Sequence, residues 1–81
     1  MRLTKVIKGK KRVGKVWTGK ARGVNKACVG VQGPDVRIPK KLQRYVKPAK
    51  RMQVHGCKAL SKGGLKWAIN RATKLANAAR V

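Results

Sequence analysis

The chain has 81 residues, enough for one small domain but not for a second core. It carries 23 lysine and arginine side chains and a single acidic one, Asp35, which gives a formal net charge of +22. So few carboxylates nearly exclude internal ion pairs and leave little for acid/base catalysis, and the unpaired positive charge indicates a polymeric anion as partner.

The first 23 residues are predicted to form a basic arm, either extended or in short strands. Apolar and other residues alternate over 2–7 and again over 12–18, which is typical of strands, and a Gly-Lys-Lys run separates the two stretches. Nine of the bases fall in residues 2–22. Basic runs of this kind bind phosphate without reading bases, and they also serve as localisation signals.

Residues 24–81 are predicted to form a small α+β domain with short antiparallel strands. Residues 24–32 are rich in β-forming side chains, and the Gly-Pro-Asp sequence that follows is typical of a turn. A second short strand after this turn predicts a hairpin near 24–38. Residues 40–46 are expected to form one or two helical turns, and residues 51–57 a further strand.

A C-terminal amphipathic helix near 64–80 is the clearest predicted element. Its apolar residues span an arc of about 120°. The apolar stripe consists of Leu65, Ala68, Ile69, Ala72, Leu75, Ala76 and Ala79. The residues expected to contact other subunits of a large assembly are Leu65, Ile69, Ala72, Leu75 and Ala76.

Two tryptophans are candidates for stacking on bases, which contributes about 1–3 kcal/mol per base. Trp67 shares one side of the expected helix with Arg71 and Lys74, away from the apolar stripe. Trp17 shares one side of an expected strand with Lys15. The alternative for Trp67 is packing on the strands or on another subunit, because a core short of aromatics recruits a tryptophan readily.

The candidates for phosphate contact lie in the arm, in the segment before the last expected strand, and in the helix. Lysine outnumbers arginine 15 to 8, which favours sequence-independent contact because lysine acts as a point charge. The candidates are Lys5, Lys8, Lys10, Lys11, Arg12, Lys15, Lys40, Lys41, Arg44, Lys47, Lys50, Arg51, Arg71 and Lys74.

Cys28, His55 and Cys57 raise the questions of a metal site and of catalysis. Zinc usually takes four ligands in spaced pairs, and here the His-Gly-Cys spacing is too close and a fourth ligand is missing. We therefore expect no metal and no other cofactor. Because nothing orients the histidine, we also expect no enzymatic activity and no small-molecule substrate. Buried thiols that are not oxidised are the expectation for the cysteines, with a Cys28–Cys57 disulfide as the alternative.

Together these features predict a non-enzymatic structural protein that neutralises the backbone phosphates of DNA or RNA. The first setting is a small virion or capsid-associated protein, with its apolar stripe on the shell and its basic segments on the packaged genome. The alternatives are a small ribosomal protein on ribosomal RNA and a cationic membrane-active protein with an interfacial helix. The expected location is inside a virion or an intracellular nucleoprotein particle, because neither a signal peptide nor an apolar run of ~20 residues is seen.

Overall fold

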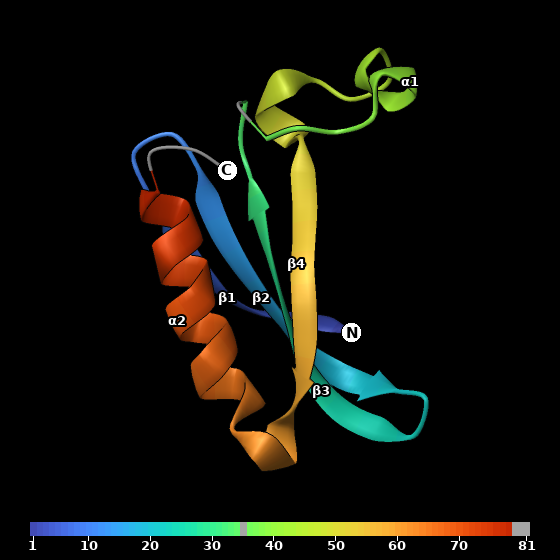
Figure 1. Ribbon diagram of the computed structural model, residues 1–81, viewed down its shortest axis with the longest axis vertical. Helices are drawn as coiled ribbons and strands as arrows, with labels where there is room; N and C mark the ends of the chain where they lie inside the picture. Colours follow the sequence, from blue (N-terminus) through green and yellow to red (C-terminus); the bar gives the residue numbers. More distant parts are fainter. Residues whose placement is uncertain (35, 79–81) are drawn as a thin grey trace.

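A computed structural model describes residues 1–34 and 36–78, so Asp35 and the predicted stripe residue Ala79 lie outside the described part of the chain. Four strands and one long helix make up most of the fold, and short helical segments connect them (Figure 1). In chain order the elements are β1 (Arg2–Lys8), β2 (Val13–Ala21), β3 (Val24–Gln32), α1 (Lys40–Gln43), η1 (Pro48–Lys50), β4 (Met52–Ala59), η2 (Leu60–Lys62) and α2 (Gly64–Asn77).

The strands form one antiparallel sheet in the order β1-β2-β3-β4, so each strand pairs with its neighbour in sequence. Helix α2 lies along one face of this sheet, mainly over β3 and β2 (Figure 1). The predicted α+β fold, with antiparallel strands and a C-terminal helix, is therefore confirmed.

The core between the sheet and α2 is built from small side chains. Val16 and Val29 from the sheet meet Ala68 and Ala72 from the helix, and all four are fully buried. Such small residues allow a close approach: a β-carbon added at Gly14 would collide with the backbone carbonyl of Ala72. The packing of α2 on the sheet thus depends on small side chains on both the helix and the strands.

Most of the predicted apolar stripe packs on the sheet of its own chain. Ala72 and Ala76 are buried, and Ile69 and Leu75 pack partly against the core. Leu65 is 40% exposed and is the stripe residue with the most accessible surface among those described. Because a small core needs the stripe to cover it, little of the stripe is left for another subunit.

Two features of the predicted architecture differ from the structure. Residues 1–23 form no separate arm, because β1 and β2 belong to the sheet. The hairpin near 24–38 is wrong: β3 pairs with β2 along one edge and with β4 along the other, and residues 36–39 form no strand. The eight-residue β4 offers β3 a longer hydrogen-bonded edge than a three-residue strand would, and Val36 is buried without joining the sheet.

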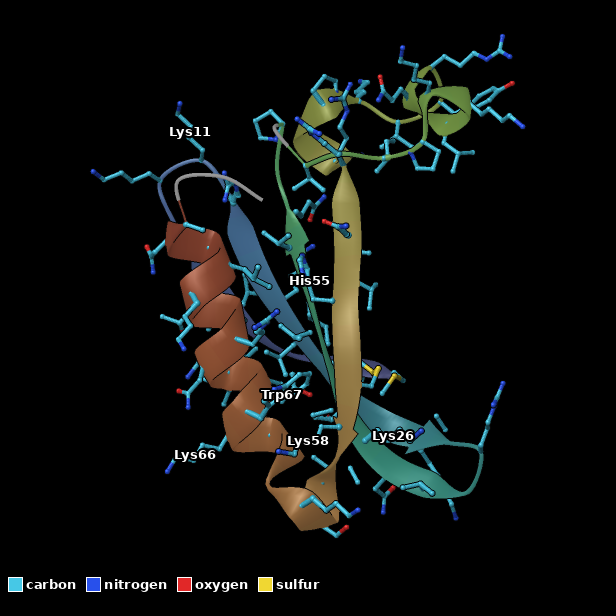
Figure 2. The ribbon with its side chains drawn as sticks, in the orientation of Figure 1. Lys11, Lys26, His55, Lys58, Lys66 and Trp67 are labelled. Carbon is cyan, nitrogen blue, oxygen red and sulfur yellow. A yellow bond between two sulfur atoms is a disulfide. The ribbon has the colours of Figure 1, made fainter. Side chains whose placement is uncertain are left out.

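The sheet leaves one face uncovered by α2. Successive side chains of a strand alternate between faces. Since Val16 and Val29 face the helix, Trp17 and Cys28 point to the uncovered side. Cys28 lies directly opposite Cys57 on β4, with their Cα atoms 4.0 Å apart, and the two form a disulfide on the side of β4 away from α2 (Figure 2). The expectation of reduced thiols is therefore wrong, because this strand pairing places the two sulfurs side by side.

Candidate nucleic-acid interface

One end of the molecule carries eleven of the 23 bases. The turn between β1 and β2, which lies beside the C-terminal end of α2, and the connection between β3 and β4 are both at the top of Figure 1. We call this surface the basic end and define it by Lys8, Lys10, Lys11, Arg12, Arg37, Lys40, Lys41, Arg44, Lys47, Lys50 and Arg51.

The strand order explains why these bases come together. In an antiparallel meander the successive connections alternate between the two ends of the sheet. The first connection, 9–12, and the third, 33–51, therefore share one end, whereas the second, at Arg22 and Gly23, lies at the other. Segments about 30 residues apart in sequence thus lie at the same end of the sheet.

Most of the bases at this end are available to an outside anion. Lys10, Lys11, Lys40 and Lys41 are exposed, and Lys11 points away from the body of the protein (Figure 2). The residues that the structure describes include no aspartate or glutamate, so none of these lysines has a carboxylate partner among them. Their charge is therefore available for phosphate.

Arg12 differs from the other bases because it is only 2% exposed. Its Nη1 atom donates a 3.5 Å hydrogen bond to the carbonyl of Leu75, in the last turn of α2. A cation at this position also interacts favourably with the negative end of the helix dipole. We conclude that Arg12 serves mainly to fix α2 on the sheet, and phosphate contact through Arg12 is no longer expected.

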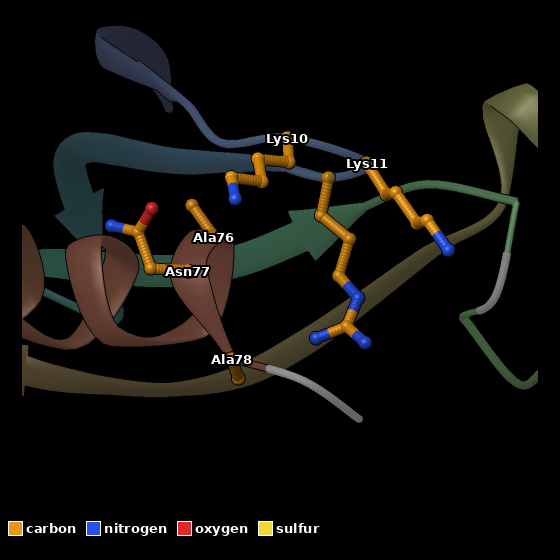
Figure 3. Close-up of a pocket in the computed structure, with 6 residues that line it drawn as sticks. Lys10, Lys11, Ala76, Asn77 and Ala78 are labelled. Atoms are coloured by element: carbon orange, nitrogen blue, oxygen red, sulfur yellow. The ribbon is translucent and has the colours of Figure 1, made fainter.

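A hollow of about 300 Å³ lies between the β1–β2 turn and the end of α2 (Figure 3). Lys10 and Lys11 line it together with Arg12, Ala76, Asn77 and Ala78. Figure 3 shows Lys10 on the side of the helix end and Lys11 turned away from it. The helix C-terminus carries only a partial negative charge, and Arg12 already donates to the Leu75 carbonyl there, so the helix end opposes an anion less than the cations attract it. The exposed lysine ends around the hollow therefore remain available to phosphate.

The connection between β3 and β4 also presents an aromatic ring that sequence reasoning missed. Tyr45 is 73% exposed, and the guanidinium carbon of Arg44 lies 5.3 Å from its ring centroid. The adjacent α1 is held by Gln43, whose Nε2 donates to the Ile38 carbonyl at 3.0 Å. The sequence feature that could have indicated Tyr45 as a site residue is its position as the one aromatic residue within a basic stretch. A ring so exposed among cations is suited to packing on a sugar or base.

Most of the other predicted phosphate-contact residues lie away from the basic end. Lys5 pairs with Val16 and so faces the α2 side, whereas Lys15 faces the uncovered side. Arg71 and Lys74 are exposed on α2, and Lys74 lies in its last turn, beside the basic end. The structure therefore brings Lys74 near the turn bases, but it does not bring Lys5, Lys15 and Arg71 together with them.

Trp67 packs against the core rather than standing on the outer side of α2. Its ring lies between helix and sheet, and a β-carbon added at Gly56 of β4 would lie 3.8 Å from it (Figure 2). This position agrees with the packing alternative and favours it over base stacking.

His55 lies on the side of β4 that faces α2 (Figure 2). Its Nε2 atom is buried and makes no hydrogen bond to the described part of the chain. Burial, and secondarily the charge of Arg71, lowers the pKa of His55 below its usual 6.5. The folded protein therefore binds this proton less readily than the unfolded chain.

We expect the free energy of unfolding to be highest above pH 6.5 and to decrease as the pH falls from there toward the lower pKa of the folded state. Urea unfolding of the wild type and of His55→Gln over this range measures the effect. With one histidine and one acidic side chain in the sequence, little else titrates there. An equally steep pH dependence in His55→Gln would contradict the assignment.

Over residues 1–34 and 36–78, no three potential metal-ligating side chains gather, and no helix has the length and apolarity to cross a membrane. Comparisons of the chain with protein-family models, with curated proteins and with solved structures found no match.

Proposed function

We propose that this protein is a non-enzymatic nucleic-acid-binding protein that neutralises backbone phosphates through its basic end. The observation that carries the proposal is the gathering of ten bases, besides the buried Arg12, at one end of a domain whose described residues include no carboxylate side chain. Lysine-rich surfaces of this kind act on phosphate through charge and counterion release rather than through base reading.

The proposed setting remains a virion or another nucleoprotein particle, with the ribosome as the alternative. Because the apolar stripe of α2 packs on the chain's own sheet, it supports docking on a capsid shell less than the sequence alone does. The same packing weakens the membrane-active alternative, which needs those side chains for lipid. Sequencing the nucleic acid cross-linked to the protein in its native particle distinguishes a packaged genome from ribosomal RNA.

Salt dependence tests the proposed mode of binding. If eight cations of the basic end contact phosphate, the slope of log K against log salt concentration is expected to be about −7 on duplex and about −6 on a single strand. Fluorescence anisotropy of a labelled oligonucleotide over a series of salt concentrations measures it. A slope near zero would exclude phosphate neutralisation as the main source of affinity.

A further inference from the structure

The face of the sheet that α2 leaves uncovered has an apolar centre. A hollow of about 280 Å³ lies there, lined by Met1, Trp17, Cys28, Met52 and Val54. Val54 is 58% exposed, and Met52 is 41% exposed. The volume is close to the lower limit of ordinary small-ligand pockets, about 300 Å³. This face thus offers a seat for a small apolar group.

Trp17 is held in a fixed position beside this hollow. It pairs with Cys28 across β2 and β3, and its ring extends over Gly30, two residues further along β3. A β-carbon added at Gly30 would lie only 3.0 Å from Cζ3 of the indole. The missing side chain therefore lets the ring lie close to the sheet, where it is half-buried and lines the hollow. An aromatic ring ordered before binding loses little entropy when a partner stacks on it.

Lysines surround the apolar centre on the same face. Lys15 lies two residues before Trp17 on β2, and Lys26 lies two residues before Cys28 on β3. Because residues two apart on a strand share a face, both lysines lie on the uncovered side with Trp17. Figure 2 places Lys26 on the side of β4 opposite α2. An apolar seat between two cations matches a flat base joined to phosphates on either side.

This charge also decides against a second copy of the chain as the occupant. Each copy carries a formal charge of +22 and has a single acidic side chain, so two uncovered faces would bring their lysines together with little negative charge to offset them. A polyanion that carries its own apolar groups fits both the apolar hollow and the lysines beside it.

We infer that the uncovered face seats an unpaired base of a single-stranded nucleic acid on Trp17, with the flanking phosphates on Lys15 and Lys26. The inference rests on the proposed function and adds to it the class of nucleic acid. Duplex bases are stacked on one another inside the helix and cannot enter this hollow, whereas the bases of a single strand can turn outward.

The test uses the Trp67→Phe variant, in which Trp17 is the one remaining tryptophan, so that the indole fluorescence reports on Trp17 alone. It is titrated with a short oligothymidylate and with an abasic strand of the same length, which carries the same phosphates without bases. We expect oligothymidylate to quench Trp17 and to bind about 5- to 150-fold more tightly than the abasic strand, corresponding to about 1–3 kcal/mol for one stacked base.

Trp17→Leu, measured by anisotropy of labelled strands, is the matched variant. It keeps an apolar side chain but removes the ring, so its affinity for oligothymidylate is expected to fall toward that for the abasic strand, and any remaining difference is assigned to Tyr45. Circular dichroism checks its fold. If this variant does not fold, the comparison of the two strands on the Trp67→Phe protein decides alone.

The outcomes separate the inference from the proposed function. Equal affinity for the two strands on the Trp67→Phe protein would overturn the base seat and leave phosphate neutralisation intact. Failure to bind either strand at low salt would overturn the proposed function itself. Quenching of Trp17 that rises with protein concentration without nucleic acid would assign the face to a second copy and overturn the inference.

Discussion

Replacing Lys10, Lys11, Lys40 and Lys41 together with glutamine is expected to weaken binding of a single strand about 600-fold at about 0.1 M salt. Each phosphate contact adds about 0.7 to the slope of log K against log salt concentration, so four contacts contribute about 2.8 to it. Relative to 1 M salt, where this contribution vanishes, they therefore contribute about 2.8 orders of magnitude in affinity at about 0.1 M, which is about 600-fold. All four side chains are exposed at the basic end, so the change should leave the core intact. Anisotropy of a labelled strand at several salt concentrations measures both affinity and slope.

The opposite end of the molecule provides a matched control for this variant. Lys20, Lys58, Lys62 and Lys66 are also exposed and lie around the β2–β3 turn, the end of β4 and the beginning of α2. Their exchange for glutamine removes the same charge, but because salt screens charges beyond about 10 Å, we expect a loss of roughly tenfold or less. Equal losses in the two variants would show that binding follows net charge and not the basic end.

Composition is the basis for proposing a polyanion as partner, but it does not indicate which surface would bind one. The excess of bases over one acid indicates a polyanion before any fold is known. The basic end, in contrast, exists only because the first and third connections of the sheet share one end. Tyr45 and the seat beside Trp17 depend on exposure and on the pairing of Trp17 with β3, and neither can be read from spacing alone.

The individual elements were predicted better than their pairing. The alternating patterns over 2–7 and 12–18 correspond to β1 and β2, and the β-forming run over 24–32 corresponds to β3. The apolar stripe near 64–80 predicted α2. The hairpin near 24–38 failed because the partner of β3 lies beyond a connection of 19 residues, 33–51, which local turn chemistry does not reveal. The pairing of β3 with β4 also brings Cys28 opposite Cys57. Because the sequence did not predict this pairing, it did not predict the disulfide either.

Gly14→Ala is expected to destabilise the fold by about 3 kcal/mol, near the upper end of the cost of overpacking a core. The added β-carbon would meet the backbone carbonyl of Ala72, which no side-chain rotation can move. Relief therefore requires α2 to move away from β2 and to expose the core beneath it. Because a domain of 81 residues has little stability to spare, much of the variant should be unfolded. Urea unfolding without nucleic acid, followed by tryptophan fluorescence, measures the change.

Gly23→Ala isolates the collision from the general effect of replacing glycine. Both substitutions restrict the unfolded chain equally. At Gly23 an added β-carbon meets nothing within 4 Å, and only the positive φ of 79° opposes it. That strain costs about 1–2 kcal/mol, so Gly14→Ala should be the more destabilised variant by at least about 1 kcal/mol. Equal stabilities would mean that α2 lies further from the sheet than the contact of Gly14 with Ala72 implies. In that case the burial of the helix stripe, and with it the argument that the stripe is not available to other subunits or to lipid, would fail.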